Sequence, residues 1–145
     1  MIDMVKAMAA LPDEPRKTML GERLRMFAEM GEPERARAMR EMVSALSNLP
    51  RTDQKRLIGT RMAVLLELPE AARQALLSAH MQVLQGLSSE AQRGELEIVN
   101  ELMDEMPEAM RATANQKMGD MMAPMLHQLH AQQAKKYAWC PICKV

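Results

Sequence analysis

Aromatic residues are nearly missing from this chain, which has one Phe, one Tyr and one Trp among 145 residues. Single-stranded nucleic acids bind proteins largely by stacking their bases on aromatic side chains, and few such platforms exist here. Net charge is lacking too, because 19 basic and 19 acidic residues give a formal charge of +0. A neutral chain exerts no general attraction on phosphate backbones or acidic membranes. We therefore expect no nucleic-acid partner.

The sequence also lacks long apolar runs, a secretory signal and a cysteine framework. Charged residues interrupt every apolar run well before the roughly 20 residues that a membrane-spanning helix needs. Residues 1–6 lack the basic region and the apolar block of a secretory signal. The two cysteines form a single CxxC, which excludes a scaffold held by several disulfides. We expect no membrane span and an intracellular, cytoplasmic location.

Residue sets typical of enzymes are lacking as well. Only six glycines occur, and none form a phosphate-binding loop. No Ser/His/Asp or Cys/His set falls at helical positions that would bring its members together. His80 lies on an apolar stripe, which predicts a buried, hydrogen-bonded histidine rather than a catalytic one. The sequence predicts a protein without enzymatic activity.

An internal repeat is the main feature that the sequence does have. Residues 11, 49 and 87 are all leucine and lie 38 positions apart, and many other residues follow the same period. A fixed period of 20–50 residues is typical of repeat architectures. The copies cover about 11–48, 49–86 and 87–125. Among the matched apolar sets are Leu20, Ile58 and Leu96; Phe27, Leu65 and Met103; and Met30, Leu68 and Met106.

Each copy is expected to form a pair of helices. Apolar residues such as Met19, Leu20 and Leu24 recur at helical spacing, and prolines mark the starts, where a helix needs no backbone donor. Ser88 is expected to cap the N-terminus of a helix in the third copy. The expected helices cover about 2–10, 13–30, 34–47, 50–67, 69–85, 88–105 and 107–136, the last one kinked at Pro124.

These patterns predict an all-α fold of three tandem helical hairpins, preceded by an N-terminal capping helix. One hairpin cannot bury its own apolar face, so stacking of the copies supplies the core. The stack is either a short, open α-solenoid or a closed helical bundle. HEAT repeats are similar in length, and that similarity is architectural only. We expect a helical repeat domain over 1–126, followed by a C-terminal extension and CxxC tail over 127–145.

A Glu-x-x-Arg pair recurs at the start of the second helix of each copy. Its arginines are Arg35, Arg73 and Arg111. Each arginine can pair with the glutamate three residues before it, which lies in the positive first turn of the helix. Alternatively, it can reach the glutamate of the adjacent copy and form a ladder. A third interpretation is a row of arginines that binds a partner or ligand.

The C-terminal tail carries the residues most suited to binding a metal. The segment Cys140-Pro141-Ile142-Cys143 resembles one half of the zinc sites in zinc ribbons and RING domains. Zinc takes four nitrogen or sulfur ligands, and His127 and His130 are the nearest residues that could complete the set. The alternatives are a zinc ion shared between two chains, a redox-active CxxC, a c-type haem attachment and a free tail.

Methionine is abundant, with 17 residues in the chain. Thioethers bind Cu(I), yet most of these methionines recur at the spacing of a helix core, where Met fills irregular gaps. The densest group is Met118, Met121, Met122 and Met125. We interpret this group as core or as a surface that binds a protein partner, with a copper site as the alternative.

The function predicted from these features is a non-catalytic interaction or assembly scaffold. Its Met-rich groove would bind a helix of a protein partner. The alternative is a metal-binding protein, with zinc at the tail or copper at the methionine group. A third interpretation is a redox adaptor that uses the CxxC. The sequence leaves open whether the chain forms a homo-oligomer.

Overall fold

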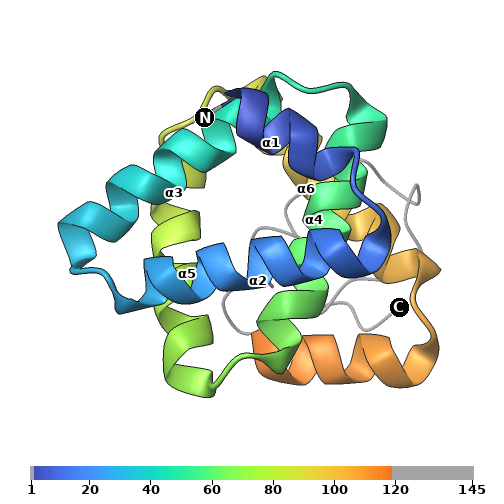
Figure 1. The fold of residues 1–145 in the computed structure, drawn as a ribbon. Helices are drawn as coiled ribbons and strands as arrows, with labels where there is room; N and C mark the ends of the chain where they lie inside the picture. The colour runs from blue at the N-terminus through green and yellow to red at the C-terminus, as the bar shows by residue number, and fades with distance from the viewer. Residues whose placement is uncertain (1, 119–145) are drawn as a thin grey trace. The chain divides into compact units, whose positions relative to one another are not determined.

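The computed structural model describes residues 2–118, and every regular element in that range is a helix (Figure 1). The helices are α1 (Ile2–Ala9), α2 (Asp13–Glu29), α3 (Glu32–Ser47), α4 (Arg51–Glu67), α5 (Glu70–Gln85) and α6 (Ser89–Glu105). Residues 108–118 are helical as well. The all-α prediction is confirmed, and these helix bounds lie within two residues of the expected ones.

The residues that begin the helices act as the sequence suggests, with one correction. The Ser88 hydroxyl accepts a hydrogen bond from the backbone N–H of Ala91 at 3.1 Å, so it is the expected cap of α6. Pro12, Pro50 and Pro69 precede α2, α4 and α5 as N-cap residues rather than as the first helical residues. Their carbonyl groups accept the first helical hydrogen bonds, and this role needs no proline N–H.

The links between helices have matching conformations 38 residues apart. Met30, Leu68 and Met106 are all extended, with φ of −70°, −75° and −70° and ψ of 158°, 152° and 145°. Each N–H donates to the carbonyl three residues before it. Asn48 and Gly86, also 38 residues apart, both end their helices in the right-handed helical conformation. The period in the sequence therefore corresponds to a period in local structure.

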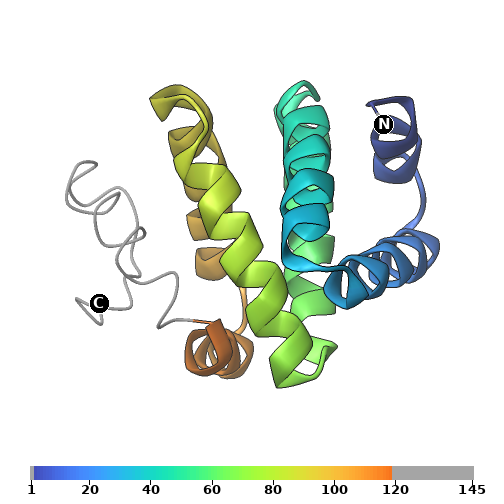
Figure 2. The ribbon, with the colours of Figure 1, turned by 90° about the vertical axis from the view of Figure 1, so that its left-hand side faces the viewer.

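The chain divides into two compact units between Leu87 and Ser88. In the first unit the most extensive packing joins alternate helices, α3 with α5 and α2 with α4. Helix α2 crosses α4 and α5 in Figure 1, and Figure 2 shows α3 beside α5. The consecutive helices α2 and α3 contact each other less. The arrangement as closely packed hairpins therefore stays a prediction.

The first unit has a core formed by all of its helices. Its large side chains that are less than 2% exposed include Phe27, Leu24, Ile58, Leu76 and Leu84. Burial of such side chains contributes roughly 1.5–3 kcal/mol each relative to leaving them exposed. Met19, one of the apolar residues that recur at helical spacing on α2, is 44% exposed and lies outside this core. His80 on α5 is buried, as predicted.

The second unit contains α6 and the helical residues 108–118. Among the described residues of this unit, the buried apolar ones are Leu96, Ile98, Val99, Met103, Ala114 and Met118. On α6, Leu96, Val99 and Met103 follow each other at spacings of three and four residues and so share one face of the helix. The boundary that the sequence suggests between 126 and 127 lies outside the described residues.

Candidate functional site

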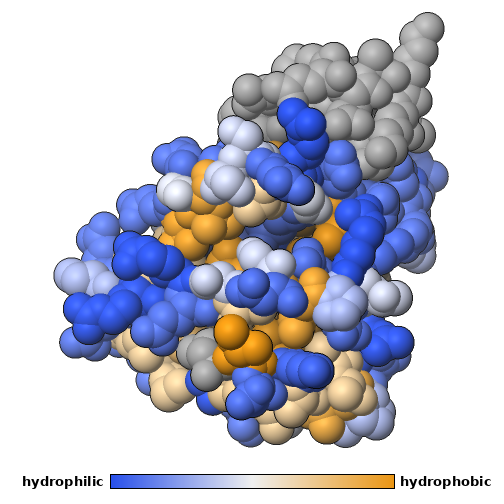
Figure 3. All heavy atoms as spheres, turned by 90° about the horizontal axis from the view of Figure 1, so that it is seen from above, coloured by the Kyte–Doolittle hydropathy of each residue, from blue (hydrophilic) through white to orange (hydrophobic). Residues whose placement is uncertain are grey.

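Helix α1 lies on a face of mixed polarity. Seen from above, this face shows apolar side chains gathered between charged ones (Figure 3). The α1 residue Ile2 is 51% exposed, whereas Val5 and Met8 on the same helix are buried. The helix is thus amphipathic, and its buried side points toward α3 and α4.

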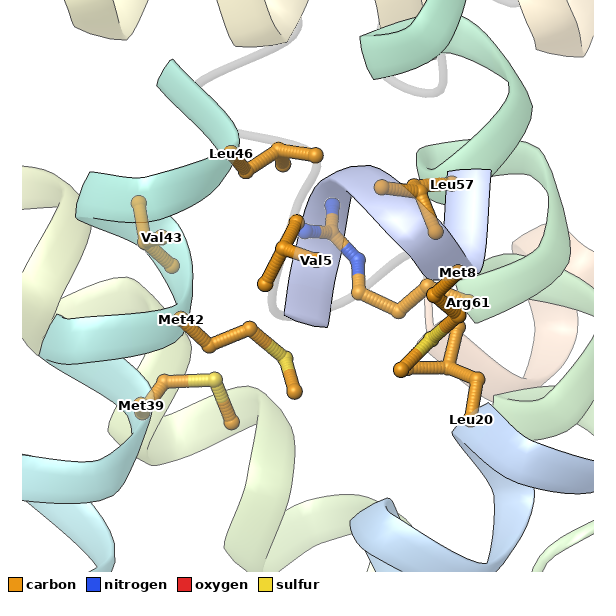
Figure 4. A pocket seen from close by; sticks show the side chains of 9 residues that line it. All are labelled: Val5, Met8, Leu20, Met39, Met42, Val43, Leu46, Leu57 and Arg61. Carbon is orange, nitrogen blue, oxygen red and sulfur yellow. The ribbon is translucent and has the colours of Figure 1, made fainter. Parts of the chain in front are cut away.

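An apolar pocket lies beneath α1, with a cavity volume of about 30 Å³ (Figure 4). It is lined by Val5 and Met8 of α1, Leu20 of α2, Met39, Met42, Val43 and Leu46 of α3, and Leu57 and Arg61 of α4. We call this site the α1 pocket. This volume exceeds the roughly 10–15 Å³ that a cavity needs to hold one water molecule.

The periodicity of the helices places these side chains at the pocket. Met39, Met42, Val43 and Leu46 recur at intervals of one, three and four residues, so they share one face of α3. Val5 and Met8 are three residues apart on α1 and form the opposite wall. Two walls of the pocket are therefore each formed by a single helix face, one of α1 and one of α3, and α2 and α4 supply the remaining residues.

Three thioether groups give the α1 pocket its chemical character. The side chains of Met39 and Met42 extend from α3 toward Met8 and Leu20 on the opposite side (Figure 4). Methionine is unbranched and polarizable, so its side chain adapts to differently shaped neighbours. A wall of this kind can reshape itself around an apolar group. It offers no acid, base or nucleophile for catalysis.

Arg61 is the one charged residue among those that line the α1 pocket. It is half-buried, and its side chain runs along the wall near Val5 (Figure 4). The aliphatic part of an arginine can cover apolar surface while the guanidinium group keeps polar contacts. The α1 pocket thus combines apolar walls with a positive charge at one side.

Arg35 and Arg73, predicted as partner-binding residues, form hydrogen bonds to the end of the preceding helix. The guanidinium of Arg35 donates to the carbonyl groups of Phe27, Ala28 and Met30 at 2.6–3.1 Å. Arg73 is only 7% exposed, and its Nη1 donates to the Leu68 carbonyl at 2.9 Å. The last carbonyl groups of a helix have no regular partner within it, so both arginines act as C-terminal caps.

The remaining residues predicted as sites are only partly described. Arg111 is half-buried, and its backbone N–H donates to the Pro107 carbonyl at 2.9 Å. Met118 is buried, which fits a core position. The other predicted residues lie outside the described residues: Met121, Met122, Met125, His127, His130, Cys140 and Cys143.

A buried arginine that the sequence did not single out joins three segments of the first unit. Arg16, in the first turn of α2, donates from Nε to the Thr60 hydroxyl of α4 at 2.8 Å. Its Nη1 donates to the Leu11 carbonyl at 2.7 Å, and its Nη2 pairs with Asp13. The 38-residue period relates Arg16 to Gln54 in the second copy. Gln54 makes the corresponding hydrogen bond, to the Leu49 carbonyl at 2.8 Å.

A second connection between α2 and α4 is an exposed ion pair. Lys17 Nζ lies 2.6 Å from Glu67 Oε1. The hydrogen bond to Glu67 and the negative charge of its carboxylate raise the pKa of Lys17 above its ordinary value of 10.5. Because the pair faces solvent, it adds little to stability.

Comparison with family models, with curated proteins and with solved structures finds no match to this chain. The described residues contain no group of three or more His, Cys, Asp or Glu side chains placed to hold a metal ion. Between residues 2 and 118, no helix is both long and apolar enough to cross a membrane. The features that bear on function are therefore the α1 pocket and the patterns of the sequence.

Proposed function

We propose that this chain is a non-catalytic interaction protein that binds an amphipathic helix of a protein partner at the α1 pocket. The observation that carries the proposal is the pocket itself, an apolar space lined by three methionine side chains beside a surface helix. Amphipathic helices bind such sites by inserting apolar side chains spaced three or four residues apart. The methionines allow the site to accept side chains of different shape.

The charge of Arg61 adds a preference to this proposal. A partner helix with a carboxylate about one turn from its apolar anchor would bring opposite charges together at the edge of the α1 pocket. Such a contact at the rim adds mainly to the rate of association and to the choice of orientation. The apolar anchor supplies most of the affinity.

We further propose that the chain is built as a short stack of helical repeats. The matched links at Met30, Leu68 and Met106 support this, because their backbone conformations agree within 13°. Packing between alternate helices also supports it, since stacked copies bring equivalent helices together. In this arrangement Arg35 and Arg73 are structural caps, and the partner binds at the N-terminal end of the stack.

The test is a selection of helical peptides against the full chain, followed by methyl NMR with labelled methionines. We expect peptides with apolar residues at intervals of three and four to shift the methyl signals of Met39 and Met42. The Met42→Gln variant, which places a polar group in the α1 pocket, should bind at least about tenfold more weakly. Met26→Gln is the matched control, because Met26 is 47% exposed and does not line the pocket.

Two results would contradict this function. One is the absence of any peptide that binds more tightly than about 1 mM, the weak end of specific recognition. The other is a set of peptides that bind without shifting the pocket methyl signals. Circular dichroism of Met42→Gln shows whether the variant keeps its helices, so that a loss of binding is not mistaken for unfolding.

The metal-binding alternative rests on the spacing of His127, His130, Cys140 and Cys143. Zinc at these residues would form a Cys2His2 site at the end of the chain. Protein purified under reducing conditions should then contain one zinc per chain, and Cys140→Ser should lose it while the helices remain. Protein without metal, prepared in the same way, would argue against this alternative. Copper bound by methionine would appear in the same metal analysis.

A further inference from the structure

Three apolar side chains of helix α1 pack against the rest of the first unit. Val5, Met8 and Ala9 are 3%, 1% and 1% exposed, and they follow the spacing i, i+3, i+4. They pack against a groove formed by α2, α3 and α4. This is the pattern by which an amphipathic helix of a partner occupies a groove, but here the helix belongs to the same chain.

Apolar packing is what holds α1 in this groove. Its two charged side chains, Asp3 and Lys6, are exposed and form no ion pair or hydrogen bond with any other described residue. By contrast, α2 is joined to α4 through Arg16 and Lys17. An isolated helix shorter than about 12 residues is only marginally stable in water, so α1 depends on its packing in the groove to remain helical.

The fit between α1 and the groove is incomplete. The α1 pocket, about 30 Å³ in volume, separates Val5 and Met8 from Met39 and Met42 (Figure 4). Side chains that line a void lack dispersion contacts on one side. A helix with a larger apolar residue in the place of Val5 would fill this space and gain those contacts.

We infer that α1 is a displaceable cover and that a partner helix competes with it for the groove of α2, α3 and α4. The partner is an amphipathic helix with apolar residues at i, i+3 and i+4, the first of them larger than Val. This inference rests on the proposed function and adds a regulatory step to it. The link after α1 remains in place, because the Leu11 carbonyl accepts a hydrogen bond from Arg16.

The test uses the full-length chain with two aspartates on the buried side of α1, Val5→Asp with Met8→Asp. The probe is a synthetic peptide of residues 1–12 with Leu in the place of Val5, followed through the methyl signals of Met39 and Met42. We expect this double variant to bind the probe at least about tenfold more tightly than the unmodified chain does. Ala7→Asp is the matched control, because it adds a charge on the exposed side of α1.

Equal binding of the probe by the double variant and the unmodified chain would overturn the inference. Hydrogen exchange of the unmodified chain gives a second test that does not depend on the variant folding. We expect the amides of residues 5–9 to exchange at least about tenfold faster than those of α3, because α1 opens locally. Equal protection of α1 and α3 would also overturn the inference.

The same experiments separate this inference from the proposed function. Selected partner peptides that shift the Met39 and Met42 signals while the amides of α1 stay protected would support the function and overturn the displacement of α1. If no peptide binds to the unmodified chain or to any variant, both the proposed function and the displacement of α1 are contradicted.

Discussion

Three arginine residues of the first unit occupy different environments. Arg16 is 7% exposed and joins α2 to α4, Arg35 caps the end of α2, and Arg61 lines the α1 pocket. The sequence distinguishes these roles poorly, because all three residues lie in helices rich in charge. What separates them is which carbonyl or hydroxyl groups the fold brings within reach. A buried guanidinium is tolerated only where such acceptors are present.

Replacement of Arg16 by Ala tests the most connected of these residues. We expect a loss of about 2–3 kcal/mol in the free energy of unfolding, because Thr60 and the Leu11 carbonyl lose a charged donor. Urea denaturation measures this loss. Arg16→Gln should cost less, since Gln54 makes the corresponding bond to Leu49. A loss below about 0.5 kcal/mol for Arg16→Ala, typical of surface substitutions, would show that the contacts are not structural.

The pKa of Lys17 gives a prediction about pH. Its hydrogen bond to Glu67 raises the pKa above 10.5, so the pair contributes to stability below that pH. The contribution is lost as the pH rises through the raised value and the amine loses its proton. NMR titration of the Lys17 side chain should show a pKa that returns toward 10.5 in Glu67→Gln. An identical pKa in both proteins would contradict the ion pair.

At the scale of helices, most boundaries could be predicted from the sequence. Pro12, Pro50, Pro69 and Ser88 mark starts because their local chemistry suits a helix N-terminus. The exposure of Met19 could not be predicted, because α2 carries apolar residues around much of its circumference. A helix of this kind has no single apolar stripe that identifies its buried side.

The packing of alternate helices and the α1 pocket could not be predicted either. The local period places Met39 and Met42 on one face of α3, but it does not say which helix that face meets. The presence of Val5 and Met8 on the opposite wall depends on contacts between residues more than 30 positions apart. Such contacts follow from the tertiary arrangement, on which local patterns have little bearing.

A larger side chain on α1 tests whether the α1 pocket can be filled and the packing of α1 improved. Val5→Ile adds one carbon beside a void of about 30 Å³, so we expect a gain of about 0.5–1 kcal/mol in stability. Val64→Ile is the matched control in α4, because Val64 is 2% exposed and does not line the α1 pocket. There the added carbon should destabilise by about 1–3 kcal/mol. Destabilisation by both changes, measured by thermal unfolding, would show that the void cannot be filled from α1.

At the scale of the whole molecule, the division between Leu87 and Ser88 coincides with the predicted start of the third copy. The packing of α3 with α5 and of α2 with α4 lies within the first unit. The hydrogen bonds of Arg16, Arg35 and Arg73 described above are also internal to it. A compact unit with its own core is expected to be able to fold alone.

The fragment 1–87 should therefore fold without the rest of the chain. We expect a helical circular dichroism spectrum and a single cooperative transition in urea, because the core around Phe27 and Ile58 is retained. Arg16→Ala should destabilise the fragment by the same amount as the full chain, since Thr60 and Leu11 are both present. A helical fragment without a cooperative transition would mean that the first unit needs residues 88–145 to fix its packing, and the repeats would then stabilise one another across the division at Leu87.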